Sequence, residues 1–130
     1  MKLIEVVNAY LAADEMSRET WPYAVALAVV KVKRAVKDEV DFFLGMEREL
    51  VGKYADTDER GNIRMTAPTR FAFKDPAAAA DYERERRELE QTEVAPTWTP
   101  MRVKAPEAIK PAALEALAGF IEFVGEGEPL

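Results

Sequence analysis

The residues whose types and spacing come closest to supporting chemistry are those at positions 56–62. Their sequence, Asp-Thr-Asp-Glu-Arg-Gly-Asn, followed by isoleucine, matches a calcium-binding loop at the first, third, sixth and eighth positions. Such loops bind calcium through oxygen ligands and need a bidentate glutamate at the twelfth position. Here the fifth position is Arg60, whose charge repels calcium, and the twelfth is Ala67. We therefore predict a polar turn, in which Gly61 and Asn62 tolerate positive φ, and assign no metal.

Two pairs of glutamates, Glu85 with Glu88 and Glu90 with Glu93, form a second candidate. Their spacing is the one that all-helical nucleotide pyrophosphohydrolases use to hold magnesium. Those enzymes need a matching acidic pair on another helix, which this sequence does not provide, and three arginines lie among these carboxylates. We interpret the segment as a solvated helix face. A metal-dependent nucleotide or nucleic-acid enzyme using Glu85 and Glu88 is kept as an alternative function.

The composition removes the usual catalytic residue types. The chain has no cysteine and no histidine, and therefore no disulfide, no thiol nucleophile, and neither the commonest metal ligand nor the commonest general base. The single serine, Ser17, has no glycine-flanked elbow and no histidine to activate it. We predict a protein that is not an enzyme and has no catalytic residues and no cofactor.

A basic cluster and two tryptophans are the candidates for a binding surface. Lys31, Arg34 and Lys37 lie within about two turns and could contact phosphate or an acidic protein, although acidic residues follow within a turn. Trp98 is the first choice of interface anchor and Trp21 the second, because both lie in proline-containing segments where a side chain is easily left at the surface. These five residues form the predicted partner interface.

The net charge of −6 argues against a general nucleic-acid binder. The apolar run at residues 23–30 is too short to span a bilayer, and residues 1–7 carry a charge and no cleavage pattern, so we expect no membrane segment and no signal peptide. A chain of 130 residues is long enough for one core. We predict a soluble, cytoplasmic protein with a single domain over residues 1–130.

The element that must position these residues is predicted to be one continuous helix over residues 22–54. Its valines make a strand the competing interpretation for residues 24–32, but the pattern continues for about eight turns, longer than an ordinary strand. Gly45 is expected to mark a kink or a close helix contact. The apolar positions, spaced by three or four, are Val25, Val29, Val32, Val36, Val40, Phe43, Met46 and Leu50.

The flanking segments predict a predominantly helical α+β fold, with the long central helix packed against N- and C-terminal helices. A small antiparallel sheet over residues 62–74, which residues 97–104 would extend, covers one end. In chain order we expect a helix over residues 2–13, then hairpin strands over 62–66 and 70–74, and a helix from Pro76 to about residue 91. An extended connection or edge strand follows over residues 92–104. The chain then forms a helix over 111–124 and ends in a short disordered tail over 126–130.

The order of features resembles small uncharacterised proteins of tailed bacteriophages and prophages. The resemblance rests on Lys-Tyr-Ala-Asp-Thr-Asp-Glu-Arg-Gly-Asn at 53–62, on the charged helix end Glu-Leu-Glu-Gln-Thr-Glu-Val at 88–94, and on the closing segment at 114–123. The resemblance implies a phage origin, and with it a location in the cytoplasm of the host cell, more than it implies an activity. It transfers no catalytic residues to this chain.

Together with the lack of the usual catalytic residue types, this resemblance predicts a non-catalytic accessory protein that binds another protein. It would act either as an inhibitor of a host system, such as transcription, a nuclease or an immune effector, or as an assembly adaptor. The second alternative function is a nucleic-acid binder using the patch at residues 31–37. The valine-rich helix face could be buried within one chain or in a homodimer.

Overall fold

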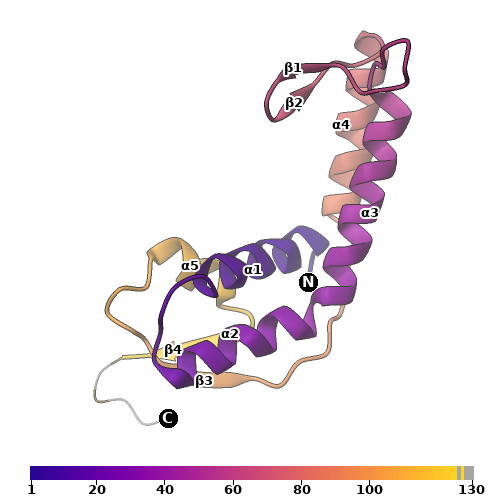
Figure 1. Ribbon diagram of the computed structural model, residues 1–130. Coiled ribbons are helices and arrows are strands. Elements are labelled where there is room, and N and C mark those ends of the chain that lie inside the picture. The colour runs from indigo at the N-terminus through magenta and orange to yellow at the C-terminus, as the bar shows by residue number, and fades with distance from the viewer. Residues whose placement is uncertain (126, 128–130) are drawn as a thin grey trace.

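The computed structural model describes residues 1–125 and 127, and it has the shape of a letter L (Figure 1). The mostly helical α+β fold predicted from the sequence is confirmed. A body and an arm make up the two limbs. The body comprises α1 (Leu3–Met16), α2 (Tyr23–Ala35), β3 (Met101–Lys104), α5 (Pro111–Leu117) and β4 (Ile121–Val124).

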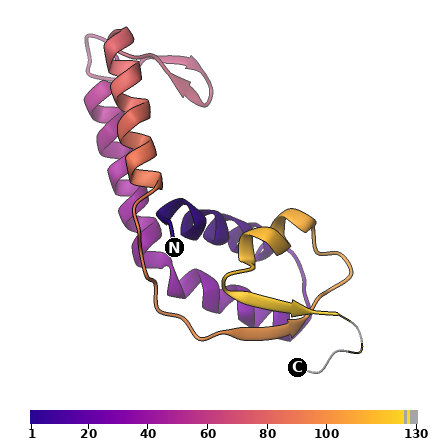
Figure 2. The ribbon, with the colours of Figure 1, turned by 180° about the vertical axis from the view of Figure 1, so that it is seen from behind.

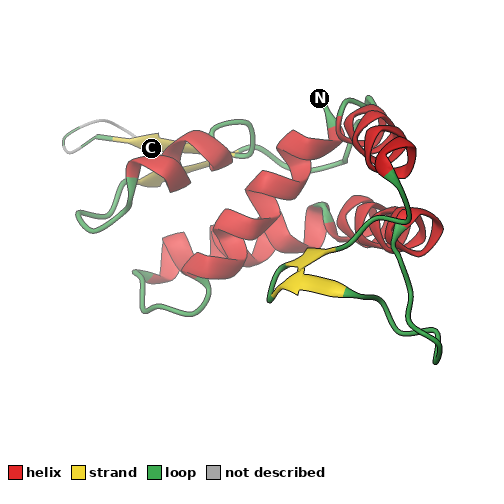
Figure 3. Cartoon of the chain, turned by 90° about the horizontal axis from the view of Figure 1, so that it is seen from above, coloured by secondary structure: helices red, strands yellow, loops and turns green. Residues whose placement is uncertain are grey.

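The arm comprises α3 (Lys37–Tyr54), α4 (Pro76–Glu90) and a hairpin of β1 (Met65–Ala67) and β2 (Arg70–Phe71). Seen from behind, α4 runs back along α3 towards the body, and the chain then passes around the outside of the bend to β3 (Figure 2). Seen from above, α3 and α4 lie side by side, with the hairpin beside their far ends (Figure 3).

The predicted continuous helix over residues 22–54 is wrong, because the chain bends at Val36. This residue has φ −110° and ψ 4° and separates α2 from α3. Its N–H still donates to the Val32 carbonyl at 3.2 Å, and its own carbonyl accepts from Val40 at 3.0 Å. The bend lets both helices pack on α1. The apolar spacing keeps its phase across the bend, so the pattern does not reveal it.

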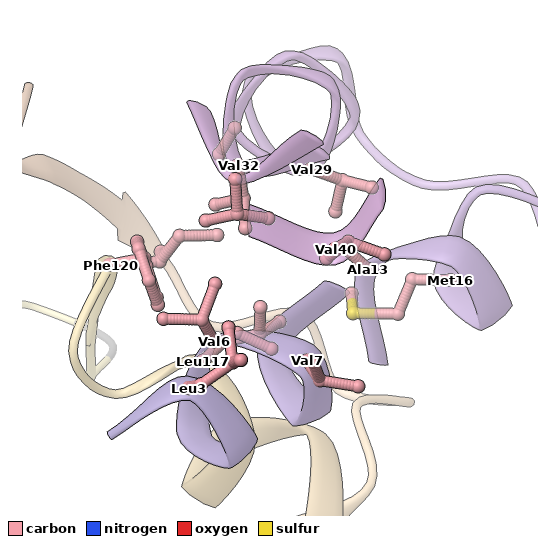
Figure 4. Packing of buried hydrophobic residues seen from close by; sticks show 14 of the residues in the cluster. Leu3, Val6, Val7, Ala13, Met16, Val29, Val32, Val40, Leu117 and Phe120 are labelled. Carbon is pink, nitrogen blue, oxygen red and sulfur yellow. The ribbon is translucent and has the colours of Figure 1, made fainter. Parts of the chain in front are cut away.

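The core lies where α1, α2, the start of α3 and the chain around α5 and β4 meet (Figure 4). Full burial of a large apolar side chain contributes about 1.5–3 kcal/mol, so this cluster dominates the stability of the body. Met46 and Leu50 are only partly buried against it. The other apolar positions predicted for the long helix are at most 4% exposed, namely Val25, Val29, Val32, Val36, Val40 and Phe43.

The predicted helix over residues 111–124 is wrong beyond Leu117. Residues 121–124 form β4, which pairs in parallel with β3, from Met101 opposite Ile121 to Lys104 opposite Val124. Helix α5 is the crossover between the two strands. The prediction that β3 joins the hairpin sheet is therefore also wrong. β-branched and aromatic residues after Gly119 favour a strand once a partner strand is available.

Most local predictions elsewhere hold. Helix α1 extends to Met16, three residues beyond its predicted end. The hairpin is antiparallel, with shorter strands than expected. Helix α4 begins where predicted, with the Asp75 carboxylate accepting from the Ala78 N–H at 2.7 Å.

Gly45 marks neither a kink nor a close contact, since α3 continues through it and an added Cβ would meet nothing within 4 Å. Residues 126 and 128–130 of the predicted tail lie outside the described residues. In the part of the chain that the structure describes, every helix is too short or too polar to cross a bilayer.

Candidate interaction surfaces

Trp21 forms one wall of an apolar pocket between α1 and the segment that leads into α5. The pocket has a volume of about 250 Å³, and its other apolar walls include Leu11, Met16 and Ile109. The Trp21 indole N–H donates to the Met16 carbonyl at 2.8 Å, which holds the ring in place. Alanines on the facing turn of α5 leave the space open, because their side chains are too small to fill it. We call this site the Trp21 pocket.

The rim of the Trp21 pocket is acidic. Glu15 and Glu19 contribute two carboxylates, and Lys110 contributes one ammonium group. Lys110 lies 3.5 Å from Glu15, in a pair whose side chains are both largely exposed and therefore weakly coupled. Within the described residues Glu19 forms no ion pair, so the rim keeps a negative charge. Leu11 adds an apolar side chain that is 57% exposed.

Trp98 occupies a different place, in the connection between α4 and β3. Its ring packs on Phe120 with the centroids 4.6 Å apart, and the side chain is half-buried. Lys31 and Arg34 of α2 line a shallow depression together with Trp98. The fold therefore brings these three predicted interface residues together, and we call the site the basic depression.

The other two predicted interface residues lie apart from the basic depression. Trp21 belongs to the pocket at the opposite end of α2. Lys37 does not line the depression, and its ammonium group donates to the Asp41 carboxylate at 2.7 Å. That hydrogen bond raises the pKa of Lys37. The five residues thus do not form one surface: three line the basic depression, Trp21 lines the pocket and Lys37 lines neither.

An exposed apolar stripe on α2 is a feature that the sequence interpretation missed. Tyr23, Leu27 and Val30 are 94%, 55% and 38% exposed. Their spacing of four and three places them on one helix face, away from the core residues of α2. The same spacing is readable in the sequence, but the valine pattern of the buried face is stronger and masks it. The stripe leads along α2 towards Lys31 and Arg34 of the basic depression.

The candidate metal ligands on α4 and just after its end either pair with cations or make no ion pair within the described residues. Glu85 lies 3.4 Å from the Lys53 ammonium group, and Glu93 lies 3.0 Å from the N-terminal amino group. Glu90 pairs with an arginine one turn earlier, and Glu88 is exposed. Over residues 1–125 and 127, acidic side chains do not gather in any group of three or more that could hold a metal ion.

The segment at residues 56–62 forms a polar turn. The Asp58 carboxylate accepts from the N–H groups of Arg60 at 2.9 Å and Asn62 at 3.0 Å. Gly61 has φ +82°, as predicted, whereas Asn62 does not adopt positive φ.

No family model matches the chain, and no curated protein and no solved structure matches it either.

Proposed function

We propose that this chain is a non-catalytic, phage-type accessory protein that acts by binding another protein at the Trp21 pocket. One observation carries the proposal: an apolar pocket opens to solvent beside an indole ring held in place by its own hydrogen bond. Concave apolar sites that accept one anchoring side chain supply most of the energy in many protein interfaces.

The size and charge of the pocket define the partner. A volume of about 250 Å³ lies below the range of about 300–1,000 Å³ that is usual for small-molecule sites, and it suits a single large apolar side chain. The carboxylates of Glu15 and Glu19 at the rim favour lysine or arginine beside that side chain. The expected partner segment is therefore a basic one with an aromatic or leucine anchor.

Two roles fit such binding, both in the cytoplasm of a host cell. In the first, the protein occupies a surface of a host enzyme or immune effector and inhibits it. In the second, the body binds one phage component while the projecting arm reaches another, as an assembly adaptor. The L shape and the resemblance to phage proteins support both roles, and the identity of the partner separates them.

The test is an affinity capture of the tagged protein from lysate of phage-infected cells, with mass spectrometry of the bound proteins. Ala112→Phe fills the pocket from an exposed position on α5, and Glu19→Lys reverses the charge of its rim. Ala80→Phe and Glu88→Lys make the same changes at exposed positions on α4. We expect the pocket variants to lose a partner that wild-type protein and both controls retain.

Capture that is equally strong with all four variants would refute the Trp21 pocket as the binding site. Capture of no protein at all would refute the protein-binding function. A host polymerase, nuclease or immune effector that depends on the pocket identifies an inhibitor, whereas a phage structural protein identifies an adaptor.

A further inference from the structure

The outer face of α2 combines an apolar stripe with unpaired positive charge. Tyr23, Leu27 and Val30 form the stripe, and Lys31 and Arg34 follow it at the C-terminal end of the helix. Both cations are exposed, and within the described residues neither forms an ion pair. We call this surface the α2 face.

The charge of α2 is opposite to that of the chain as a whole. The helix contains three basic residues and no acidic residue, whereas the chain has a net charge of −6. Lys33 is the third cation, and it is neutralised by Asp14 of α1 at 2.9 Å. The remaining two cations lie beside Trp98 in the basic depression. The α2 face therefore attracts negative charge at one end and apolar side chains along its length.

The geometry points to an acidic amphipathic helix as the occupant of the α2 face. We propose that such a helix, supplied by a partner protein, lies along α2. Leucine-like side chains at its positions i, i+4 and i+7 would contact Tyr23, Leu27 and Val30, in the manner of helix pairing. Its aspartate or glutamate side chains would pair with Lys31 and Arg34 next to the Trp98 ring.

This proposal is independent of the Trp21 pocket, and the two sites favour partners of opposite charge. The rim of the pocket carries carboxylates, whereas the α2 face carries unpaired cations. A contact of about three turns along α2 lies at the small end of specific interfaces, so we expect a weak, salt-sensitive complex.

The experiment uses a 14-residue helical peptide of leucine and glutamate, with leucine at i, i+3, i+4 and i+7. A peptide with lysine in place of glutamate has the same apolar face and the opposite charge. Trp21→Phe leaves Trp98 as the only tryptophan, so its fluorescence reports binding at the basic depression. We expect the glutamate peptide to bind at least about tenfold more tightly than the lysine peptide, and less tightly as salt is added.

Matched variants locate the contact. Leu27→Asp removes an apolar residue from the α2 face, and Leu11→Asp changes a leucine of similar exposure on α1. We expect only Leu27→Asp to weaken binding of the glutamate peptide, by about tenfold or more. Arg34→Glu should shift the preference towards the lysine peptide. Ala112→Phe, which fills the Trp21 pocket, should leave this binding unchanged.

Three results would overturn the proposal. The first is equal binding of the two peptides, which would show that charge does not select the occupant. The second is binding that Leu27→Asp leaves intact. The third is a different occupant of the α2 face. A second copy of this chain is the occupant if the protein sediments as a dimer and Leu27→Asp makes it a monomer. A nucleic acid is the occupant if a single-stranded oligonucleotide displaces the peptide.

Discussion

The body and the arm are held together by different interactions. The body contains the continuous apolar core shared by α1, α2 and the residues around α5 and β4 (Figure 4). Beyond Phe43, the buried apolar side chains of the arm are few, namely Tyr54, Ala55, Ala78 and Leu89. Burial of apolar area stabilises the body, whereas much of the arm must be stabilised in another way.

Polar contacts join the two helices of the arm, and aromatic contacts join α4 to the hairpin segment. Arg86 of α4 is half-buried, and it donates to the Glu47 carboxylate of α3 and to the Tyr82 hydroxyl. Burial opposes the charge of Arg86, but these two hydrogen bonds outweigh it and raise the pKa of the guanidinium. Near the tip, Tyr82 packs on Phe71 and Phe73 of the hairpin segment, with ring centroids 5.3 and 5.4 Å away, and the two phenylalanine rings lie 4.9 Å apart.

The difference implies that the two limbs do not open together. Local opening costs least where buried apolar contacts are few and exposed polar contacts are many. The arm satisfies that condition and the body does not. We therefore expect a body that unfolds as one unit and an arm that opens on its own at lower free energy.

The largest effect is expected in the body. Leu117 is fully buried, and Leu117→Ala should lower the free energy of unfolding by about 2–5 kcal/mol through lost burial and a new cavity. Urea denaturation measures this loss. The control Leu44→Ala, at an exposed position on α3, should change stability by less than about 0.5 kcal/mol. Equal effects of the two substitutions would contradict the assignment of the core.

The next effect is expected in the arm. Arg86→Met keeps much of the side-chain volume but removes the hydrogen bonds to Glu47, Tyr82 and Glu90, at a cost of about 1–2 kcal/mol. Amide hydrogen exchange should accelerate in α4 and in α3 beyond Phe43, and should remain unchanged in α1 and α2. Arg84→Met, which removes a pair within α4 itself, is the control. Equal acceleration in the body would show that the limbs open as one unit.

Replacing two glycines of the arm by alanine, one at a time, should change the stability of the protein in opposite directions. Gly61→Ala places a Cβ at φ +82° and should destabilise the turn at residues 56–62 by about 1 kcal/mol. Gly45→Ala lies within α3, where a Cβ meets nothing within 4 Å, and should stabilise by about 0.5–1 kcal/mol. Thermal unfolding measures both changes. The same sign for both substitutions would be inconsistent with the backbone described for the arm.

The smallest changes in stability are expected when the pH is lowered. In the arm, the hydroxyl of Tyr54 and then the ammonium of Lys53 lower the pKa of Glu85 below its usual 4.5. In the body, the hydrogen bond from Lys33 lowers the pKa of Asp14 below 3.8. Because both pKa values are lower in the folded state, each carboxylate stabilises the fold fully above its usual pKa. That stabilisation is lost as the pH falls through the lowered value.

Carbon NMR titration of the carboxyl groups measures the two pKa values directly. Glu85→Gln should remove part of the opening of the arm that acid causes. Asp14→Asn should likewise remove part of the weakening that acid causes in the contact between α1 and α2. A carboxyl group that titrates above its usual value in the folded protein would reverse the sign of the prediction for its limb.

The sequence by itself determined the features that depend on local chemistry. Asp75 followed by proline predicts the start of α4, because the cap and the first turn need only neighbouring residues. The spacing of apolar residues between Val25 and Leu50 predicts which face of α2 and α3 is buried. Trp98, Lys31 and Arg34 could be named as surface candidates from their residue types.

The tertiary structure decided the features that depend on contacts between distant segments. The apolar spacing keeps its phase across the bend at Val36, so the local pattern is the same with or without the bend, and packing of both helices on α1 selects the bent form. Leu117, Ile121 and Val124 have helical spacing, yet pairing with β3 draws residues 121–124 into a strand. The same long-range packing brings Trp98 beside Lys31, and places Trp21 against α5 in a separate pocket. The energies of such contacts come from residues far apart in the chain, and a local pattern cannot contain them.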